Sequence, residues 1–537
     1  MAASAESPRL VQLWLLLATV LIDVIASVPC PFNEQCRCSS SDCTQQTDVI
    51  CANMVEFPQF GEHNSCNVKS LLISGSFTSI PAKAFDAFTN RFETLRIIMD
   101  DGALAETPFV VHEKAFQGSV GLMLERLEIS NVPTLTELPF ALKSLKKLQT
   151  LVLNHTSITH IPAEILSKLI GNLVITHSKV SSVDSNAFEG MEFLFDVDLS
   201  YNNLSVFPAE ALSSVMVNLR QLDLRWNDIS SLSAVSFQGY ERLNKLLLSG
   251  NPLVELPDRL FKGVEDTLIE FVCDDCHLTQ FPATALNVLP KIKKLQLRNN
   301  NFSRLPRKSF YNMTVLNVVN LDNNPIVTID YGAFDQAAFS SVALLNTALT
   351  ELDVGVFSGD NNLNSVNLTR NMLLTKIRLT TDPPLLRVQL FNLTYNNISI
   401  VEPSTFEWLR QDSKKMDISF NTFINCSEKH ILRWYAAAMD CFPSSHFVIT
   451  EAKCAMNDTP LADAIASVMP VNCEDFEPTT TTMTTTTTSA RTTTTKSSDV
   501  QFVDPGTDVK RFTIRHVSPD VSGVNHLRVI VVSIASA

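Results

Sequence analysis

Runs of positive charge are almost absent from this sequence, since no stretch of Lys and Arg is longer than a pair. Together with a net charge of -14, this argues against nucleic acid and anionic membranes as partners, because both select basic patches. Catalytic patterns are absent too: there is no G-x-S-x-G, H-E-x-x-H, glycine-rich phosphate loop or EF-hand loop, and the histidines show no metal-ligand spacing. We therefore expect no enzyme activity, no cofactor and no metal, and a basic ligand more readily than an acidic one.

Apolar runs long enough to span a membrane are also absent. The longest, Leu10 to Ile22, follows Arg9 and precedes small residues near Ser27. This order is typical of a secretory signal peptide, which we place at residues 1–27.

Cysteine is scarce over most of the chain and concentrated near its ends. Only Cys273 and Cys276 lie outside two clusters. In a secreted protein such clusters predict disulfide-bonded caps, whereas zinc, the competing interpretation, lacks its usual ligand spacings here. The cysteines predicted to form cap disulfides are Cys30, Cys36, Cys38, Cys43, Cys51, Cys66, Cys426, Cys441, Cys454 and Cys473.

What is present in abundance is a repeat of the form L-x-x-L-x-L-x-x-N-x-L. Its asparagine position recurs every 22 to 25 residues, at Thr156, Ser178, Asn202, Asn227, Asn251, Cys276, Asn300, Asn324, Thr347, Asn371, Asn396 and Asn421. A phenylalanine recurs ten residues further on, at Phe188, Phe237, Phe261, Phe310, Phe334, Phe357 and Phe406. We expect the asparagines to turn inward and bond the neighbouring coil, and the phenylalanines to fill the convex side of the core.

This periodicity predicts an α/β fold, a leucine-rich-repeat solenoid shaped as a horseshoe, with parallel β-strands on its concave face. About fifteen repeats would occupy residues 69–420, between an N-terminal cap at 28–68 and a C-terminal cap at 421–475. Solenoids need such caps because their end coils otherwise expose apolar core.

The caps carry a family resemblance. Cys30-Pro31, Cys36-Arg37-Cys38 and Cys51 resemble the first cap, and Asn421 to Cys426 with Trp434 resembles the second cap, of extracellular leucine-rich-repeat proteins such as the chaoptin, connectin and Toll-like groups. The resemblance implies the pairings Cys426–Cys454 and Cys441–Cys473. The chain departs from the family in its extra Cys43 and Cys66 and in lacking the usual C-x-C of the second cap.

The composition changes beyond the second cap. Residues 476–498 are mostly threonine and read as an O-glycosylated stalk. Residues 499–537 read as a disordered tail, with a lipid-anchor signal around Ser522 and Gly523 as the alternative. Membrane attachment is expected only through such an anchor.

Outward strand positions give the candidate ligand-binding residues. They mix aromatic rings, arginine and acids, as binding hot spots do, although an ordinary solvated face is the alternative. They are Asp198, Tyr201, Asp223, Arg225, Trp226, Asp228, Asp274, Asp275, His277, Gln296, Arg298 and Asp322. Calcium at Asp228, Asp274 and Asp275 and redox chemistry at Cys273 and Cys276 are alternatives, but a solvated acidic face and a buried disulfide or thiol pair fit the sequence better.

Glycosylation sequons narrow this site. They stand at Asn154, Asn203, Asn301, Asn312, Asn367, Asn392, Asn397 and Asn457. Asn367 and Asn392 take outward strand positions, so glycans there would cover the later repeats. We therefore expect ligand on the face from about Asp198 to Arg298.

The sequence thus predicts an extracellular recognition or adhesion glycoprotein, secreted or on the outer face of the plasma membrane, that binds an extracellular protein or glycoprotein. A homodimer is compatible with this prediction. The first alternative is a non-catalytic accessory subunit of a secreted enzyme. Leu138-Pro139-Phe140 and the short repeat ending at Ser178 resemble the non-catalytic subunit of a crustacean luciferase. The second alternative, supported by the threonine tract alone, is a structural matrix component.

Overall fold

The structure is a computed structural model. It describes residues 28–40, 46–61, 67–90, 92–102, 107–336, 338–358, 363–379, 388–409, 414–422, 424–441, 446–455 and 459–476. The predicted signal peptide, Cys43, Cys66, Asn457, the threonine-rich segment and the tail lie outside these residues.

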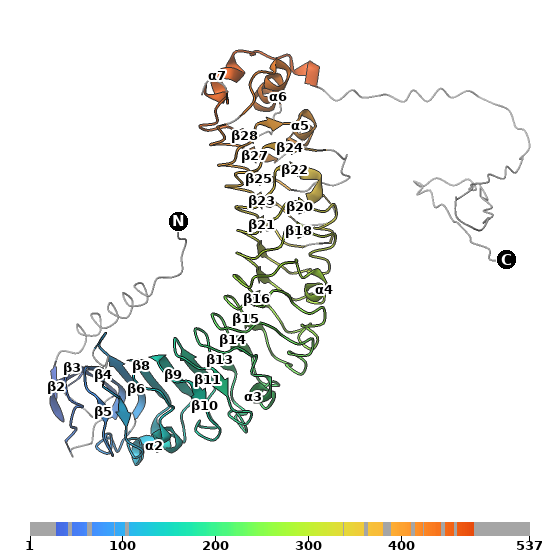
Figure 1. The fold of residues 1–537 in the computed structure, drawn as a ribbon. Coiled ribbons are helices and arrows are strands. Elements are labelled where there is room, and N and C mark those ends of the chain that lie inside the picture. The colour runs from blue at the N-terminus through green and yellow to red at the C-terminus, as the bar shows by residue number, and fades with distance from the viewer. Residues whose placement is uncertain are drawn as a thin grey trace, which may run out of the picture. The chain divides into compact units, whose positions relative to one another are not determined.

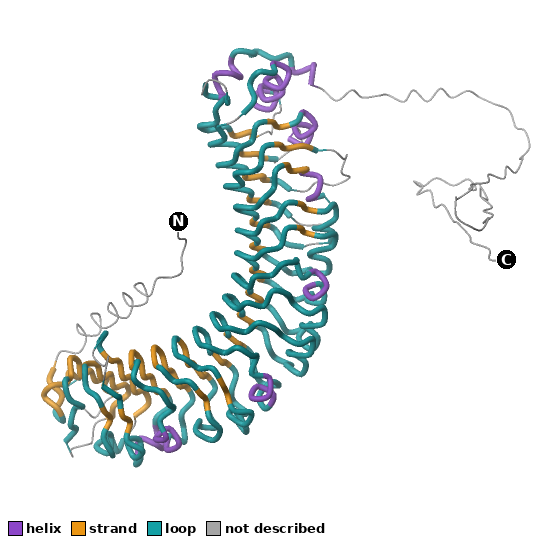
Figure 2. The backbone as a smooth tube through the Cα atoms, viewed as in Figure 1, coloured by secondary structure: helices purple, strands orange, loops and turns teal. Residues whose placement is uncertain are grey.

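The central element is one sheet of nineteen strands, whose successive repeat strands pair in parallel along the inner side of the solenoid (Figures 1 and 2). The repeat strands are β4 (Asn67–Gly75), β6 (Phe92–Met99), β8 (Arg126–Val132), β9 (Thr150–Thr156), β11 (Asn172–Thr176), β13 (Asp196–Asp198), β14 (Gln221–Asp223), β15 (Lys245–Leu247), β16 (Glu270–Val272), β17 (Lys294–Gln296), β19 (Val318–Asn320), β21 (Ser341–Ala343), β23 (Ser365–Asn367), β25 (Leu390–Asn392) and β27 (Lys415–Asp417). The predicted horseshoe-type solenoid with strands on the concave face is confirmed.

Alternation of apolar and polar residues explains the strand register. Leu173, Val197, Leu222 and Leu246 pair in register across β11, β13, β14 and β15, and all four are buried. Burying a leucine contributes about 2 kcal/mol, and each gains its burial from the coils on both sides. No coil could bury this row alone.

The convex side is built from short strands and helices. The strands are β5 (Ser79–Ile80), β7 (Val110–Val111), β10 (His160–Ile161), β12 (Ser182–Val183), β18 (Arg304–Leu305), β20 (Thr328–Ile329), β22 (Glu351–Asp353), β24 (Lys376–Arg378) and β26 (Ile400–Val401). The helices are α2 (Ser119–Met123), η1 (Phe140–Ser144), α3 (Ala209–Ser213), α4 (Ala283–Leu286), η2 (Val354–Phe357) and α5 (Pro403–Leu409). Every phenylalanine of the predicted row is fully buried, and Phe310 stacks on Phe334 at 5.3 Å between ring centroids.

The inward asparagines bond neighbouring coils, as expected. Asn227 Oδ1 accepts a hydrogen bond from the Leu204 amide at 2.9 Å, and its Nδ2 donates to the Leu199 carbonyl at 2.9 Å. These partners belong to the preceding coil. Because Asn227 is 4% exposed, its amide satisfies backbone groups that water cannot reach.

Both ends of the core are covered. At the N-terminus β1 (Val28–Cys30), β2 (Asn33–Cys38) and β3 (Gln46–Met54) extend the sheet, with disulfides from Cys30 to Cys38 and from Cys36 to Cys51. At the other end lie α6 (Lys429–Asp440), β28 (His446–Val448), α7 (Leu461–Ala466) and η3 (Cys473–Phe476). Disulfides there join Cys426 to Cys454 and Cys441 to Cys473.

No helix among the described residues is long and apolar enough to cross a bilayer.

Candidate ligand-binding face

The predicted face lies where β13 to β19 end. Asp198, Asp223 and Gln296 are the last residues of β13, β14 and β17. The position two residues after each strand end also faces outward, and it holds Arg225, Asp274, Arg298 and Asp322. The residue after that one comes just before the inward asparagine position of its coil. Tyr201, Trp226 and Asp275 occupy that position.

Asp228 and His277 lie elsewhere. Each follows the inward asparagine position of its coil, Asn227 or Cys276, and each is exposed. The predicted glycan acceptors Asn203 and Asn301 hold the same place in their coils. Asp228 and His277 are therefore rim residues beside the face.

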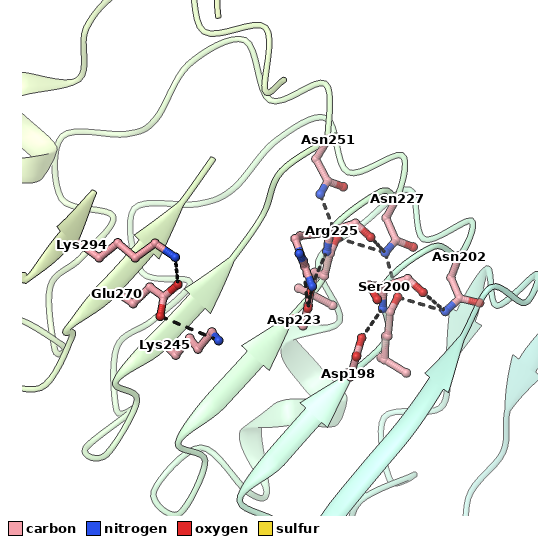
Figure 3. Close-up of polar contacts among 12 residues, drawn as sticks. Asp198, Ser200, Asn202, Asp223, Arg225, Asn227, Lys245, Asn251, Glu270 and Lys294 are labelled. Carbon is pink, nitrogen blue, oxygen red and sulfur yellow. Dashed lines mark hydrogen bonds and ion pairs between the residues drawn. The ribbon is translucent and has the colours of Figure 1, made fainter. Parts of the chain in front are cut away.

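Arg225 is already paired within its own strand end. Its Nε lies 2.9 Å from Oδ1 of Asp223 and its Nη2 lies 2.6 Å from Oδ2, so the guanidinium grips the carboxylate with two nitrogens (Figure 3). This hydrogen bonding raises the pKa of Arg225. Since Asp223 is 9% exposed, this pair fixes the position of the guanidinium and partly neutralises its charge.

A second ion group sits at the start of the strands. Glu270 accepts Lys294 Nζ at 2.8 Å and lies 3.8 Å from Lys245 Nζ (Figure 3). One carboxylate thus links three neighbouring strands, β15, β16 and β17. The group is half-exposed, so its contribution to stability is small.

Several carboxylates on the face are poorly hydrated. Burial raises the pKa of Asp198, Asp274 and Asp322, which means that each carboxylate is costlier to ionise than in water. For Asp198 the charge of Asp223 raises the pKa further. These groups would gain from a ligand that brings hydrogen-bond donors or positive charge.

Arg298 differs from Arg225. Its Nε is buried and has no hydrogen-bond partner among the described residues, although its charge lowers the pKa of both Asp274 and Asp322 to offset part of their burial. A buried donor without a partner carries a free-energy cost that a ligand acceptor could remove. Arg298 therefore has one buried donor, Nε, that is not used by any described residue.

The residue before each inward asparagine position adopts a left-handed backbone conformation. φ is 53° at His155, 47° at His177, 56° at Tyr201, 54° at Trp226 and 58° at Tyr395. Bulky residues rarely take this conformation, and it costs about 1 to 2 kcal/mol. The turn of the solenoid imposes it in coil after coil and so aligns these side chains in one row.

Four rings of that row stack into what we call the aromatic ladder: His155, His177, Tyr201 and Trp226. Successive ring centroids are 4.6, 4.1 and 5.9 Å apart, with interplanar angles of 9°, 11° and 21°. Tyr201 is 39% exposed and Trp226 is 44% exposed. The ladder is a rigid apolar ridge with polar ring atoms at its edge, the amphipathic surface that interfaces favour.

Gly250 ends the aromatic ladder. It stands in the same row with φ of 73°, and a Cβ at this position would lie 2.4 Å from Cε3 of Trp226. Only a residue without a side chain fits beneath the indole, so Gly250 sets where Trp226 can lie.

Beyond Gly250 the row becomes a ladder of amides. Asn299 Nδ2 donates to Asp275 at 3.1 Å, Asn323 donates to Asn299 at 2.7 Å, and Asn346 donates to Asn323 at 3.0 Å. All of these bonds run in one direction and end on the carboxylate of Asp275. The face thus has an aromatic half and an amide half.

Sequence reasoning found Tyr201 and Trp226 but missed His155, His177 and Gly250. The sequence carried a signal for them, because all five residues come directly before an inward asparagine position. Charge and hot-spot composition favoured aspartate and arginine instead.

The described residues contain no group of three or more His, Cys, Asp or Glu side chains arranged to hold a metal ion. Cys273 and Cys276 are fully buried and joined by a disulfide. Asn367 and Asn392 end the paired strands β23 and β25, half-buried on the later part of the face.

Three comparisons place this fold among known proteins. The family model described as leucine rich repeat matches residues 169–229 and 290–338. Chaoptin of Drosophila melanogaster is 24% identical over 191 residues, 35% of this chain and 14% of chaoptin. The Oplophorus-luciferin 2-monooxygenase non-catalytic subunit of Oplophorus gracilirostris is 28% identical over 163 residues, 29% of this chain and 44% of that subunit.

Among solved structures, the Toll–Spatzle complex of Drosophila has a chain that superposes with a TM-score of 0.51 at 15% identity, covering 79% of this chain and 58% of that one. This likeness shows the fold. The chain spans less than half the length of either sequence relative.

Proposed function

Since the chain is a leucine-rich-repeat protein, whose relatives by sequence are extracellular or cell-surface proteins, we propose that it recognises an extracellular protein or glycoprotein through the face from Asp198 to Arg298. The observation that carries this proposal is the aromatic ladder. Its two largest rings, Tyr201 and Trp226, are exposed and stack on each other, and exposed aromatic rings are enriched at protein-binding hot spots.

The surroundings of the aromatic ladder support a defined contact. Trp226 and Tyr201 supply rigid apolar area, and Arg298 supplies a positive charge beside Asp274 and Asp322. Asp198 and Asp274 offer poorly hydrated acceptors. A central aromatic anchor with polar groups around it is the usual anatomy of a protein-binding hot spot.

The test uses the full chain, expressed in animal cells and labelled, with binding to a panel of intact animal cells measured by flow cytometry. Tyr201→Ala/Trp226→Ala should reduce binding at least about tenfold, the effect typical of removing a hot-spot aromatic. Tyr395→Ala is the matched control, because Tyr395 is 45% exposed, has the same left-handed backbone and stacks on Phe420 at 4.4 Å. Equal binding by the double variant and the control would refute the proposal.

A second candidate function is a non-catalytic accessory subunit of a secreted enzyme, favoured by the match to the luciferase non-catalytic subunit. In that case the full chain should co-purify from its source with a smaller catalytic chain. Purification as a single polypeptide, with cell binding lost in Tyr201→Ala/Trp226→Ala, would exclude it.

A further inference from the structure

Opposite the aromatic ladder, the edge where the strands begin carries an open groove. The groove has a volume of about 460 Å³ and is lined by Gln149, Leu169, Gly171, Phe193, Phe195 and Asp196, among others. It runs past the starts of β9, β11 and β13, the coils that carry three of the ladder rings. The edge therefore offers a surface separate from the proposed ligand-binding face.

Large apolar side chains are exposed at the groove, beside the polar lining residues Gln149, Thr150, Asn172 and Asp196. Phe193 is 50% exposed, and Leu169 and Val217, which lie before the strand starts of the neighbouring coils, are exposed as well. Phe195 is half-buried under the guanidinium of Arg220, 4.6 Å from its ring centroid. Gly171 has no side chain, and a Cβ there would lie 3.1 Å from the Phe193 carbonyl oxygen. Large apolar side chains gathered at one edge and rimmed by polar residues are candidates for an interface.

Exposed charges of both signs lie beside the groove. Lys168 and Glu192 are exposed, hold equivalent places one coil apart, and form no ion pair with any described residue. The whole chain has a net charge of -14, so an interface between two copies has to bring opposite charges together. Lys147 is also exposed there and Asp196 lines the groove, so the edge carries charges of both signs beside its apolar side chains and can meet a second copy with opposite charges facing each other.

We propose that this edge is the interface of a homodimer with twofold symmetry. Across a twofold axis the same patch meets itself, so Phe193 and Leu169 of both copies pack together and Lys168 of each copy meets Glu192 of the other. The predicted glycan acceptors of these coils, Asn154 and Asn203, stand at the ends of the strands, on the opposite edge. Glycans there leave the groove open.

Sedimentation velocity of the full chain across a concentration series tests the dimer. The wild type should dimerise, and Phe193→Asp should raise the dissociation constant at least about tenfold, because it replaces a buried ring with a charge in both copies. Val206→Asp is the control, since Val206 is 73% exposed and lies beyond the opposite strand end. A wild type that stays monomeric at all concentrations, or a dimer that Phe193→Asp leaves intact, would overturn the proposal.

A charge exchange tests the symmetry. Lys168→Glu should weaken the dimer because it places like charges across the axis, and Lys168→Glu/Glu192→Lys should restore it. A double variant that dimerises no more tightly than Lys168→Glu would contradict the twofold arrangement.

A glycan placed at the groove gives an independent test. Lys147→Asn/Gln149→Thr creates a sequon from two exposed residues at the groove and should abolish dimerisation, whereas Gln149→Thr alone should not.

Discussion

At the scale of single residues, the position before the inward asparagine decides how the face is built. Its left-handed backbone turns each side chain into one row, whichever residue occupies it. Aromatic rings in that row stack and amides bond one another. A substitution at one position therefore alters the contacts of the equivalent residues in the preceding and following coils.

Gly250 gives the sharpest test of that row. Gly250→Ala places a Cβ within the indole of Trp226, so the ring must move, and we expect shifted tryptophan emission together with loss of cell binding comparable to that of the ladder variant. Gly102→Ala is the matched control, because Gly102 has a similar φ of 77° but nothing within 4 Å of its Cβ position. Both variants carry about 1 to 2 kcal/mol of backbone strain. Loss of binding in both would show that strain, and not the Trp226 position, is responsible.

The two ladder histidines predict a pH dependence. Burial lowers the pKa of His155 and of His177 below their ordinary 6.5, and the charge of His155 lowers that of His177 further. The unfolded chain then binds protons more readily than the folded one, so stability is full above about pH 6.5 and falls as pH decreases below it.

The measurement is the urea midpoint at pH 7.5 and at pH 5.5. His155→Gln/His177→Gln should lose less stability than the wild type between these values, and His430→Gln, on the exposed side of α6, should behave as the wild type. An identical pH dependence in all three proteins would disprove the assignment.

At the scale of elements, the caps hold the ends of an otherwise repetitive core. Trp434 of α6 packs on Phe406 of the last coil and on Phe476, with centroids 6.1 and 4.8 Å apart. The disulfides fix these elements where apolar core would otherwise meet water.

Removing a cap disulfide should cost more than removing the buried one. Cys426 and Cys454 are 28 residues apart, so Cys426→Ala/Cys454→Ala is expected to cost about 3 to 4 kcal/mol of chain entropy. Cys273 and Cys276 are 3 apart, and the same change there should cost about 1 to 2 kcal/mol. Urea unfolding compares the two variants, and an equal or reversed order would show that packing outweighs loop length.

The elements also show what the sequence could predict. Spacing alone identified Asn202, Asn227 and Asn251 as inward residues, and each amide donates to the backbone of the preceding coil. The stacking of His155 on His177 was not predictable in this way. It depends on a backbone angle that hydrophobic periodicity does not report.

The same limit applies to pairing. Arg225 was predicted as a ligand contact, but its guanidinium bonds Asp223 two residues back, whereas Arg298 keeps an unpartnered Nε. Both arginines occupy the same place in their repeats. Only the structure distinguishes them, because the side-chain rotamer and the neighbouring coil decide which acid each arginine can reach.

At the scale of the whole molecule, the proposed surfaces occupy opposite edges of the same coils. The aromatic ladder follows the strand ends, and the Phe193 groove precedes the strand starts. A dimer through the groove would leave the ligand-binding face of each copy open. The ligand proposal and the dimer proposal can therefore fail independently of each other.

The measurement that tests the central claim most directly is blocking of the ligand-binding face by a glycan. Lys294→Asn/Gln296→Thr creates a sequon on the start of β17, and Lys294→Gln/Gln296→Thr loses the same side chains without creating one. Cell binding of both full-length variants is measured by flow cytometry, with glycan occupancy confirmed by mass spectrometry. We predict that the glycosylated variant binds at least about tenfold more weakly than its partner, which controls for the loss of the Lys294 and Gln296 side chains. Wild-type binding by a fully glycosylated variant would contradict ligand recognition on this face.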